Sequence, residues 1–498
     1  MTTPARPGDA SGPGFIVQNG LDGALGRSLR LLFWRSSSVS RVSLPPDGSP
    51  ASEPPASEPP ASEPPAEAGT SIGAWAAALA PTTALPLPEP PAGQLLAEVE
   101  RLLSGAVAAR VPIGGFGWLD DAGVVDPSAG RPLWITTRMT HCFSIGALLA
   151  GDRAAQYGEL ADHGVQALLG AFRDAEHGGW FSELGGTSDA VPGGLPGSGP
   201  VKGAYGHAFV VLAGSSATVA GRPGGAELLA EALRVQEEHF WDDAAGAVVE
   251  EWDRAWTTCD PYRGANANMH TVEAYLAASD ATGDPLWRHR ALRIATRLVE
   301  NGARRHDWRL PEHFDAAWVE QPEYNRDAPA HPFRPFGVTP GHGLEWSRLL
   351  LHLEASLGVE APNWLRPAAI GLFDRALADG WDDVHGGICY TTDWAGAPVV
   401  QQHFHWVVCE GIAAAVALHR ATGEQRFADW YGRLWDYAQR VFITDGVPGW
   451  LHEANPDGTP STVTWTGRPD IYHALQATLI PVLPRAPGFP AAVAASRP

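Results

Sequence analysis

The sequence predicts an all-α protein, an (α/α)6 barrel of six helical hairpins. From residue 91 onwards, apolar residues recur with helical periodicity between loops rich in glycine and proline. Strand-like alternation is confined to short pieces such as 246–253 and 386–394, which fit small loop hairpins. The third observation is a repeat of one helical unit along the chain.

The repeat is clearest in the apolar helices that end in a glycine turn. Four of them begin with a polar residue thirteen positions before the glycine: Arg138 to Gly151, His270 to Gly283, Glu345 to Gly358 and Glu410 to Gly423. A fifth helix begins at His207 and is one residue longer, and a sixth begins near His473. These six polar residues, which we call anchors, recur every 63 to 75 positions.

More charged, amphipathic helices separate the apolar ones. They are expected at roughly residues 93–108, 157–174, 226–240, 286–302, 364–378 and 425–443. A helix that is apolar all round must be buried all round, so the amphipathic helices form an outer layer. Six such hairpins close into a ring more naturally than they end as an open α-solenoid, the alternative fold, which needs capping repeats that the sequence does not show.

Closure of the ring predicts a pocket. The inner helices of such a barrel run parallel, so their N-termini, and with them the six anchors, meet at one end. Free N–H groups there favour hydroxyl and anion ligands. The loops before these helices supply aromatic and amide side chains, namely Trp134, Tyr205, Asn266, Asn268, Trp346, Trp406 and Trp465. Aromatic faces beside amides, arginine and carboxylates indicate a carbohydrate pocket.

Domain boundaries follow from composition. Residues 48–66 contain three tandem copies of ASEPP, a Pro-rich linker that cannot bury a core. We therefore expect residues 1–88 to be a disordered extension, residues 89–492 to be the barrel domain and residues 493–498 to be a tail.

Composition excludes several functions. The formal charge is −21, and no Lys/Arg cluster stands out, so no nucleic-acid partner is expected. No apolar run of 18 residues predicts a membrane span. The four cysteines are widely spaced without a C-x-x-C pair, which favours reduced thiols in a cytoplasmic protein. Monomer and homo-oligomer are both compatible with the sequence.

No cofactor is indicated. The chain contains no P-loop, Rossmann fingerprint or G-x-S-x-G element. A zinc site on His270, His342 and His473 would need a histidine ligand pair with the usual flanks, which is absent. Imidazoles beside carboxylates instead suit general acid–base chemistry. Glu345, three residues after His342, could orient that imidazole or bind a substrate hydroxyl.

Long motifs carry a family resemblance. They are GFGWLD (115–120), LWITTRMTHCFSIGALLA (133–150), YRGANANMHTVEAYL (262–276), EHFDAAW (312–318), PFGVTPGHGLEWSRLLLHL (335–353) and DIYHALQATLIP (470–481). With them the chain resembles the N-acylglucosamine 2-epimerase superfamily over about residues 92–492. Within it, the chain is similar to the bacterial aldose–ketose isomerase branch of mannose and sulfoquinovose isomerases.

The resemblance implies a metal-free (α/α)6 barrel that acts on a monosaccharide. It implies proton transfer by two histidines, His342 and His473, between C2 and C1 of an opened sugar through a cis-enediol. Arg138 would stabilise the enediolate charge. The implied substrate-binding residues are Trp134, Arg138, Tyr205, Asn266, His270, Glu345, Trp406 and Glu410.

Two departures bear on the substrate. Sulfoquinovose isomerases carry an arginine where this chain has Pro332, and a glutamine where it has His452. A buried sulfonate needs paired donors, so a neutral hexose is expected: D-mannose converted to D-fructose, with D-lyxose to D-xylulose as a further reaction. The alternatives are a sulfoquinovose isomerase, a mannose/glucose-type 2-epimerase, an (α/α)6 glycoside hydrolase that uses Glu345 and Glu410 as acid and base, and a non-catalytic sugar-binding protein.

Overall fold

The computed structural model describes residues 89–149, 151–185, 201–444 and 446–496. The expected extension, residues 1–88, lies outside this part of the chain. Within it the six inner helices are α3 (Leu133–Leu148), α5 (Ala204–Val219), α7 (Ala265–Thr282), α9 (Pro340–Leu357), α11 (His405–Thr422) and α13 (Tyr472–Leu479).

The outer helices alternate with them along the chain. They are α2 (Ala92–Ala106), α4 (Ala154–Leu169), α6 (Gly225–Val235), α8 (Pro285–Ala295), α10 (Leu365–Gly380) and α12 (Gln425–Val441). Helices α6 and α8 each continue as a π-helical turn, Gln236–Phe240 and Thr296–Glu300. Short 3-10 turns complete the helical part at Val107–Ala109, Pro127–Ala129, Ala303–His306, Gly358–Glu360 and Ile480–Val482.

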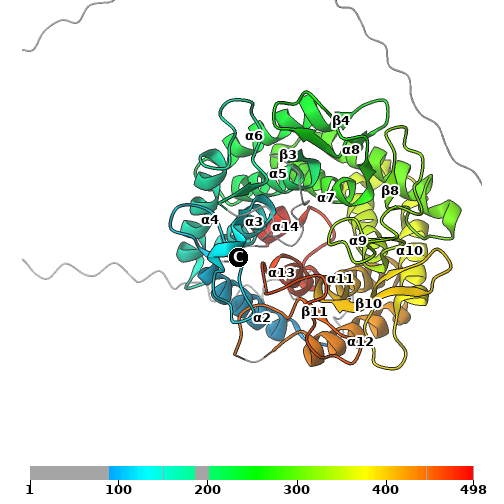
Figure 1. Ribbon diagram of the computed structural model, residues 1–498. Helices are drawn as coiled ribbons and strands as arrows, with labels where there is room; N and C mark the ends of the chain where they lie inside the picture. Colours follow the sequence, from blue (N-terminus) through cyan, green and yellow to red (C-terminus); the bar gives the residue numbers. More distant parts are fainter. Residues whose placement is uncertain (1–88, 150, 186–200, 445, 497–498) are drawn as a thin grey trace, which may run out of the picture. The chain divides into compact units, whose positions relative to one another are not determined.

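The helices close into a ring, as predicted (Figure 1). Each inner helix packs against the next, and α13 contacts both α3 and α2, so the last repeat meets the first. Burial separates the two layers: α11 buries 14 of its 18 residues, whereas α12 buries 7 of 17. The open solenoid is therefore wrong, because its first and last repeats would not touch.

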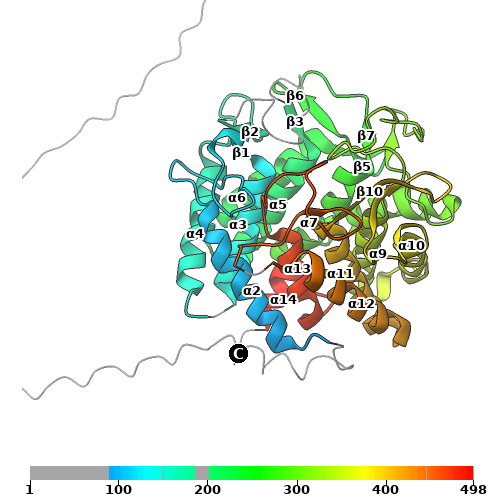
Figure 2. The ribbon, with the colours of Figure 1, turned by 60° about the horizontal axis from the view of Figure 1, so that its bottom comes forward.

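A final helix, α14 (Phe489–Ala495), packs against α3, α5 and α7. Figure 2 shows it at the end of the barrel away from most of the short strands. The helix runs past residue 492, where we placed the end of the domain, and Val493 is fully buried. The expected boundary between domain and tail therefore falls inside a packed helix.

Short antiparallel strands lie in the loops. They pair as β1 (Arg131–Pro132) with β2 (Glu183–Leu184), β3 (Val201–Gly203) with β6 (Glu251–Asp253), β4 (Trp241–Asp242) with β5 (Ala247–Val248) and β7 (Arg263–Gly264) with β8 (His313–Phe314). The order β11-β10-β9 (Glu453–Ala454, Pro398–Phe404, Cys389–Thr392) makes a three-stranded sheet. Residues 386–394 contribute to a hairpin, as predicted. Residues 246–253 instead supply two strands with different partners, because β6 pairs with the distant β3.

These strands set where the inner helices start. Strands β1, β3, β7 and β10 each run directly into α3, α5, α7 and α11. Four anchors, Arg138, His270, Glu345 and Glu410, are the sixth residue of their helices, whereas His207 is the fourth and His473 the second. Because the inner helices are parallel and these four residues are equally far from the first residue of their helices, they lie at one level of the barrel.

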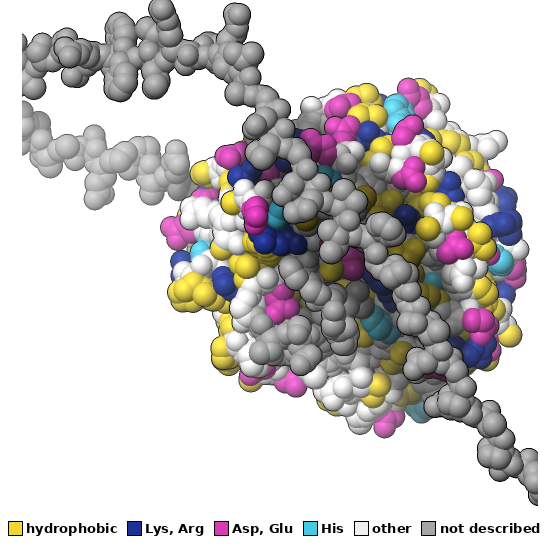
Figure 3. Space-filling view, turned by 45° about the horizontal axis from the view of Figure 1, so that its top comes forward, with side chains coloured by type: hydrophobic (Ala, Val, Ile, Leu, Met, Phe, Trp, Pro, Cys, Tyr) yellow, Lys and Arg dark blue, Asp and Glu magenta, His cyan; other side chains and the backbone are white. Residues whose placement is uncertain are grey.

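Surface features agree with the composition. On the face shown in Figure 3, acidic and basic side chains are interspersed among other residues. No described helix has the length and apolar character needed to cross a membrane. The four cysteines are free thiols, three of them buried.

Two buried histidines, the anchor His207 and His141, each bond a polar group close to the ring. His207 is 2% exposed; its Nδ1 contacts the Gly203 carbonyl at 2.8 Å, and its Nε2 accepts from the Trp180 N–H. Nδ1 of His141, 1% exposed, lies 2.6 Å from Ser216 Oγ. Burial lowers the pKa of His207 to about 3 and that of His141 to about 4. Both rings are therefore neutral in the folded protein above these values.

Acidification is expected to destabilise the barrel before carboxylates protonate. Between pH 6.5 and about 4 the unfolded chain protonates both histidines and the folded chain does not, so the free energy of unfolding falls as pH falls, by up to about 1.4 kcal/mol per pH unit for each. Thermal unfolding at pH 7.5 to 4.5 measures this. His207→Gln should flatten the dependence, and His289→Gln on exposed α8 should not. A constant midpoint between pH 7 and 5 would contradict the expectation.

Candidate active site

A cavity of about 690 Å³, counting the space at its mouth, lies where the inner helices begin. Nine of the ten predicted site residues line it: Trp134, Arg138, Tyr205, Asn266, His270, His342, Glu345, Trp406 and His473. Pro332 and His452, the positions at which the chain departs from sulfoquinovose isomerases, line it too. Further lining residues, which the sequence argument did not select for the site, include Phe333, Tyr390, Phe404, His405 and Asp470.

His342 is oriented by Glu312. Its Nδ1 lies 3.0 Å from both carboxylate oxygens of Glu312, which is 4% exposed. A carboxylate accepts only when Nδ1 carries the proton, so the tautomer with an unprotonated Nε2 is favoured. Of the two roles left open for Glu345, the orientation of His342 belongs to Glu312 instead. Glu312 opens the motif EHFDAAW, but thirty residues separate the pair, and only the tertiary structure joins them.

His473 is oriented in the same way by Glu410. Nδ1 of His473 lies 2.9 Å from Glu410 Oε1, and Arg348 Nε donates to Glu410 Oε2 at 2.7 Å. Glu410 is 1% exposed and does not line the cavity, so its predicted role as a sugar ligand is replaced by a position behind His473. The reason is the neighbouring helix α13: it begins one residue before His473, and the His473 ring lies against Glu410.

Trp406 forms a wall shared by both imidazoles. The ring centroid of His342 lies 5.4 Å from it and that of His473 lies 5.8 Å from it. Gly341 permits this contact, because a Cβ atom there would lie 2.6 Å from the indole ring. The two histidines therefore share one side of a common space.

Arg138 is held by hydrogen bonds and stacked rings. Nη1 donates to Asp470 Oδ2 at 3.1 Å, and Nη2 donates to the Tyr205 hydroxyl at 2.8 Å. Its guanidinium carbon lies 4.9 Å from the Trp134 ring and 4.7 Å from the Tyr472 ring. Apart from imidazoles, Arg138 is the only basic side chain among the described residues that line the cavity. Its charge is balanced by Asp470.

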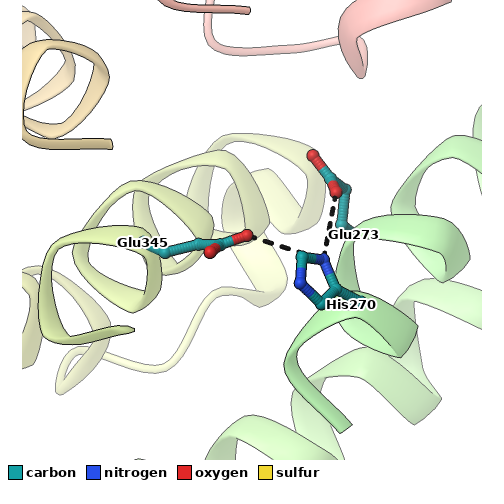
Figure 4. A group of neighbouring side chains, drawn as sticks. All are labelled: His270, Glu273 and Glu345. Carbon is teal, nitrogen blue, oxygen red and sulfur yellow. Dashed lines mark ion pairs between the residues drawn. The ribbon is translucent and has the colours of Figure 1, made fainter. Parts of the chain in front are cut away.

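His270, Glu273 and Glu345 form a buried cluster beside the cavity (Figure 4). Nδ1 of His270 lies 3.8 Å from Glu273 and 3.7 Å from Glu345. Burial lowers the pKa of His270 to about 4, and burial together with the nearby Glu410 charge raises the pKa of Glu345 well above its ordinary value. A neutral, protonated Glu345 can donate a hydrogen bond to a ligand.

The cluster has the ligand types of a metal site, since one atom from each residue lies within 4.8 Å of the others. Arg348, however, places guanidinium nitrogens 3.5 Å from both carboxylates. That fixed positive charge lies against both carboxylates, and it would repel a divalent cation bound there. The donor set therefore fits a metal poorly.

Three other sequence-selected residues lie outside the cavity. His207 lines a neighbouring space. Asn268 bonds the backbone of Val248 and Gly264. Trp346 is fully buried in the core. Its place directly after Glu345 suggested a pocket residue, but the side chain is part of the hydrophobic core of the barrel. Trp465 does line the cavity, stacked 6.0 Å from Trp118.

Comparison with known proteins identifies the family of this chain. Residues 114–477 match the sequence model of N-acylglucosamine 2-epimerase. A D-mannose isomerase of Thermobifida fusca is 49% identical over 403 residues, 80% of this chain and 96% of that protein. Another, from Pseudomonas cannabina pv. alisalensis, is 46% identical over 80% of this chain and 94% of its own length.

Solved structures agree. A crystal structure of D-mannose isomerase superposes with a TM-score of 0.72 at 30% identity, covering 78% of this chain and 97% of that one. Cellobiose 2-epimerase from Spirochaeta thermophila superposes with a TM-score of 0.67 at 22% identity over 78% and 95% of the chains, which shows the shared fold. The chain belongs to the N-acylglucosamine 2-epimerase family.

Proposed function

We propose that this protein is an aldose–ketose isomerase that interconverts D-mannose and D-fructose. The observation that carries the proposal is the pair of imidazoles in one cavity, each with Nδ1 on a buried carboxylate. The relatives named D-mannose isomerase, 46–49% identical over nearly their whole length, support the same activity.

The geometry suits proton transfer between adjacent carbons. With Nδ1–H bound to Glu312 or Glu410, each imidazole presents an Nε2 lone pair that can accept a proton. One Nε2 removes the C2 proton of the opened aldose; the C–H electrons form the C1–C2 double bond, and the C1=O π electrons move to O1. A proton passes from O2 to O1 through the cis-enediol. The imidazolium then protonates C1 as the C2=O bond of the ketose forms. Arg138, whose donors are fixed before the reaction, stabilises the developing oxyanion.

Charge favours a neutral sugar. Arg138 is already paired with Asp470, and Pro332 offers no donor at the cavity wall. Arg334, two residues on, lies 3.8 Å from Glu250 and over the Tyr262 ring, away from this cavity. A sulfonate would be buried without an unpaired cation, which disfavours sulfoquinovose. D-mannose is the proposed substrate, and D-lyxose is a second one.

The glycoside hydrolase alternative requires two carboxylates in the cavity, and Glu410 is not available as the second. An acid and a base must both reach the glycosidic bond. Glu410 cannot, because its oxygens bond His473 and Arg348 behind the cavity wall. A 2-epimerase would use the same histidines but return the proton to C2, so product analysis separates the two activities.

We further propose that the barrel, residues 89–492 together with the rest of α14, carries the activity in the cytoplasm without a metal, and that residues 1–88 are an extension. The arginine beside the carboxylate cluster supports metal independence.

The proposed activity is tested with D-mannose, D-lyxose, D-glucose and sulfoquinovose. Fructose should be the sole early product from mannose, and glucose without fructose would establish an epimerase instead. His342→Ala and His473→Ala should each lower kcat by at least about a thousandfold while the thermal midpoint stays close to wild type, because each removes a proton-transfer group. Near-wild-type turnover in either variant would remove that residue from the mechanism.

Glu312→Gln tests the support of His342. A neutral amide can donate to Nδ1 as well as accept from it, so the tautomer is no longer fixed, and kcat should fall about ten- to a thousandfold with little change in KM. The control is Glu320→Gln in the same loop, where the carboxylate pairs with Arg305 and His306 instead of a cavity histidine. Equal kcat in the two variants would show that Glu312 is not needed for the chemistry.

Metal independence is tested by exhaustive chelation. Dialysis against EDTA should leave kcat/KM unchanged, and added Zn²⁺, Mn²⁺ or Mg²⁺ should not raise it. A large loss on chelation that one of these ions restores would make His270, Glu273 and Glu345 a metal site.

A further inference from the structure

One guanidinium lies among three buried carboxylates beneath the sugar cavity. Arg348, 2% exposed on α9, donates from Nε to Glu410 Oε2 at 2.7 Å. Its other nitrogens lie 3.5 Å from Glu273 on α7 and 3.5 Å from Glu345 on the same helix. Arg348 does not line the sugar cavity; it lines a separate cavity of about 480 Å³ on the other side of the cluster.

The three carboxylates depend on Arg348 to different degrees. Glu273 also accepts from Gln476 Nε2 at 3.0 Å and from the Tyr472 hydroxyl. Glu345 is reached only by long contacts, and its Oε1 has no hydrogen-bond partner. Glu410 has the short contact to Arg348, and among the described residues its remaining side-chain partner is His473. Arg348 therefore acts mainly on Glu410.

Glu410 needs the positive charge of Arg348 in order to stay ionised. Burial raises its pKa and Arg348 opposes that effect. An ionised Glu410 accepts from Nδ1–H of His473 and leaves Nε2 unprotonated towards the cavity. A protonated Glu410 would instead donate to Nδ1 and favour the opposite tautomer, in which Nε2 carries the proton and cannot act as a base.

We propose that Arg348 is a positioning residue for catalysis: it keeps Glu410 ionised and thereby holds His473 in the tautomer that presents a basic Nε2 to the sugar. The kinetic part of this inference rests on the proposed isomerase function; the effect on the tautomer does not. Arg348 acts through Glu410 and never contacts the substrate.

Kinetics of Arg348→Gln give the first test. Loss of the cation raises the pKa of Glu410, so the acid limb of the kcat–pH profile should move to higher pH. We expect kcat at pH 7 to fall at least about tenfold, with partial recovery at higher pH and KM within about threefold of wild type. Arg348→Lys, which keeps the charge, should lose less activity and shift the limb less.

The matched control is Arg309→Gln. Arg309 makes a largely buried two-bond ion pair with Asp379, at 2.7 and 3.0 Å, outside the sugar cavity. Its loss should lower the thermal midpoint without moving the pH limb. If Arg348→Gln lowers kcat by the same factor at every pH, with the acid limb unmoved as in the control, Arg348 has only a structural role and the proposal is overturned.

A double substitution tests the route through Glu410. In a Glu410→Gln background the carboxylate that bonds His473 is gone, so adding Arg348→Gln should change kcat by less than about threefold. If the double variant loses kcat by the product of the two single-variant factors, Arg348 acts independently of Glu410.

The tautomer itself can be measured without turnover. ¹⁵N NMR of histidine-labelled full-length protein, assigned by comparison with His473→Gln, should show Nδ1-protonated His473 in the wild type and a gain of the Nε2-protonated form in Arg348→Gln. If Arg348→Gln does not fold, Arg348→Lys is measured and should show a smaller gain. An unchanged His473 tautomer in the folded variant would overturn the proposal, whatever the activity of the enzyme.

Discussion

The hydrogen-bonded chain His473–Glu410–Arg348 is the interaction on which the site depends most. It joins α13, α11 and α9 through contacts of 2.9 and 2.7 Å in a region with almost no solvent. Charged groups are costly to bury alone, so each member requires the next. The chain holds three wall helices together and fixes a proton on the inner nitrogen of a cavity histidine.

The positions at which the inner helices begin explain why such hydrogen-bonded networks can form in this fold. Short strands run directly into four of the inner helices and set their first residue. The parallel helices α3, α7, α9 and α11 each carry an anchor as their sixth residue, so these four anchors lie at one level. Arg138, His270, Glu345 and Glu410 thus meet around the axis, and only Glu410 is then covered, by α13. Arg138 and Glu410 are then satisfied by side chains of neighbouring segments, Arg138 by Asp470 and Glu410 by His473 and Arg348.

The balance of charge in the cavity limits its chemistry. Arg138 is paired with Asp470, the imidazoles of His270 and His473 have lowered pKa values because they are buried, and Glu345 has a raised one. The walls therefore offer neutral donors and acceptors with aromatic faces. Such a surface recognises hydroxyl groups, which links the structure to an uncharged monosaccharide.

The sequence by itself determined the ring of six hairpins, the end at which the site lies, and nine of its residues, because period, helix polarity and motif identity are local properties of the chain. It could not determine which carboxylate serves which histidine. Glu345 is three residues from His342, yet Glu312, thirty residues away, makes the bond. It also could not determine that Glu410 is covered or that Asp470 pairs with Arg138 across 332 positions. Those outcomes depend on side-chain depth and helix packing, which only the closed tertiary structure decides.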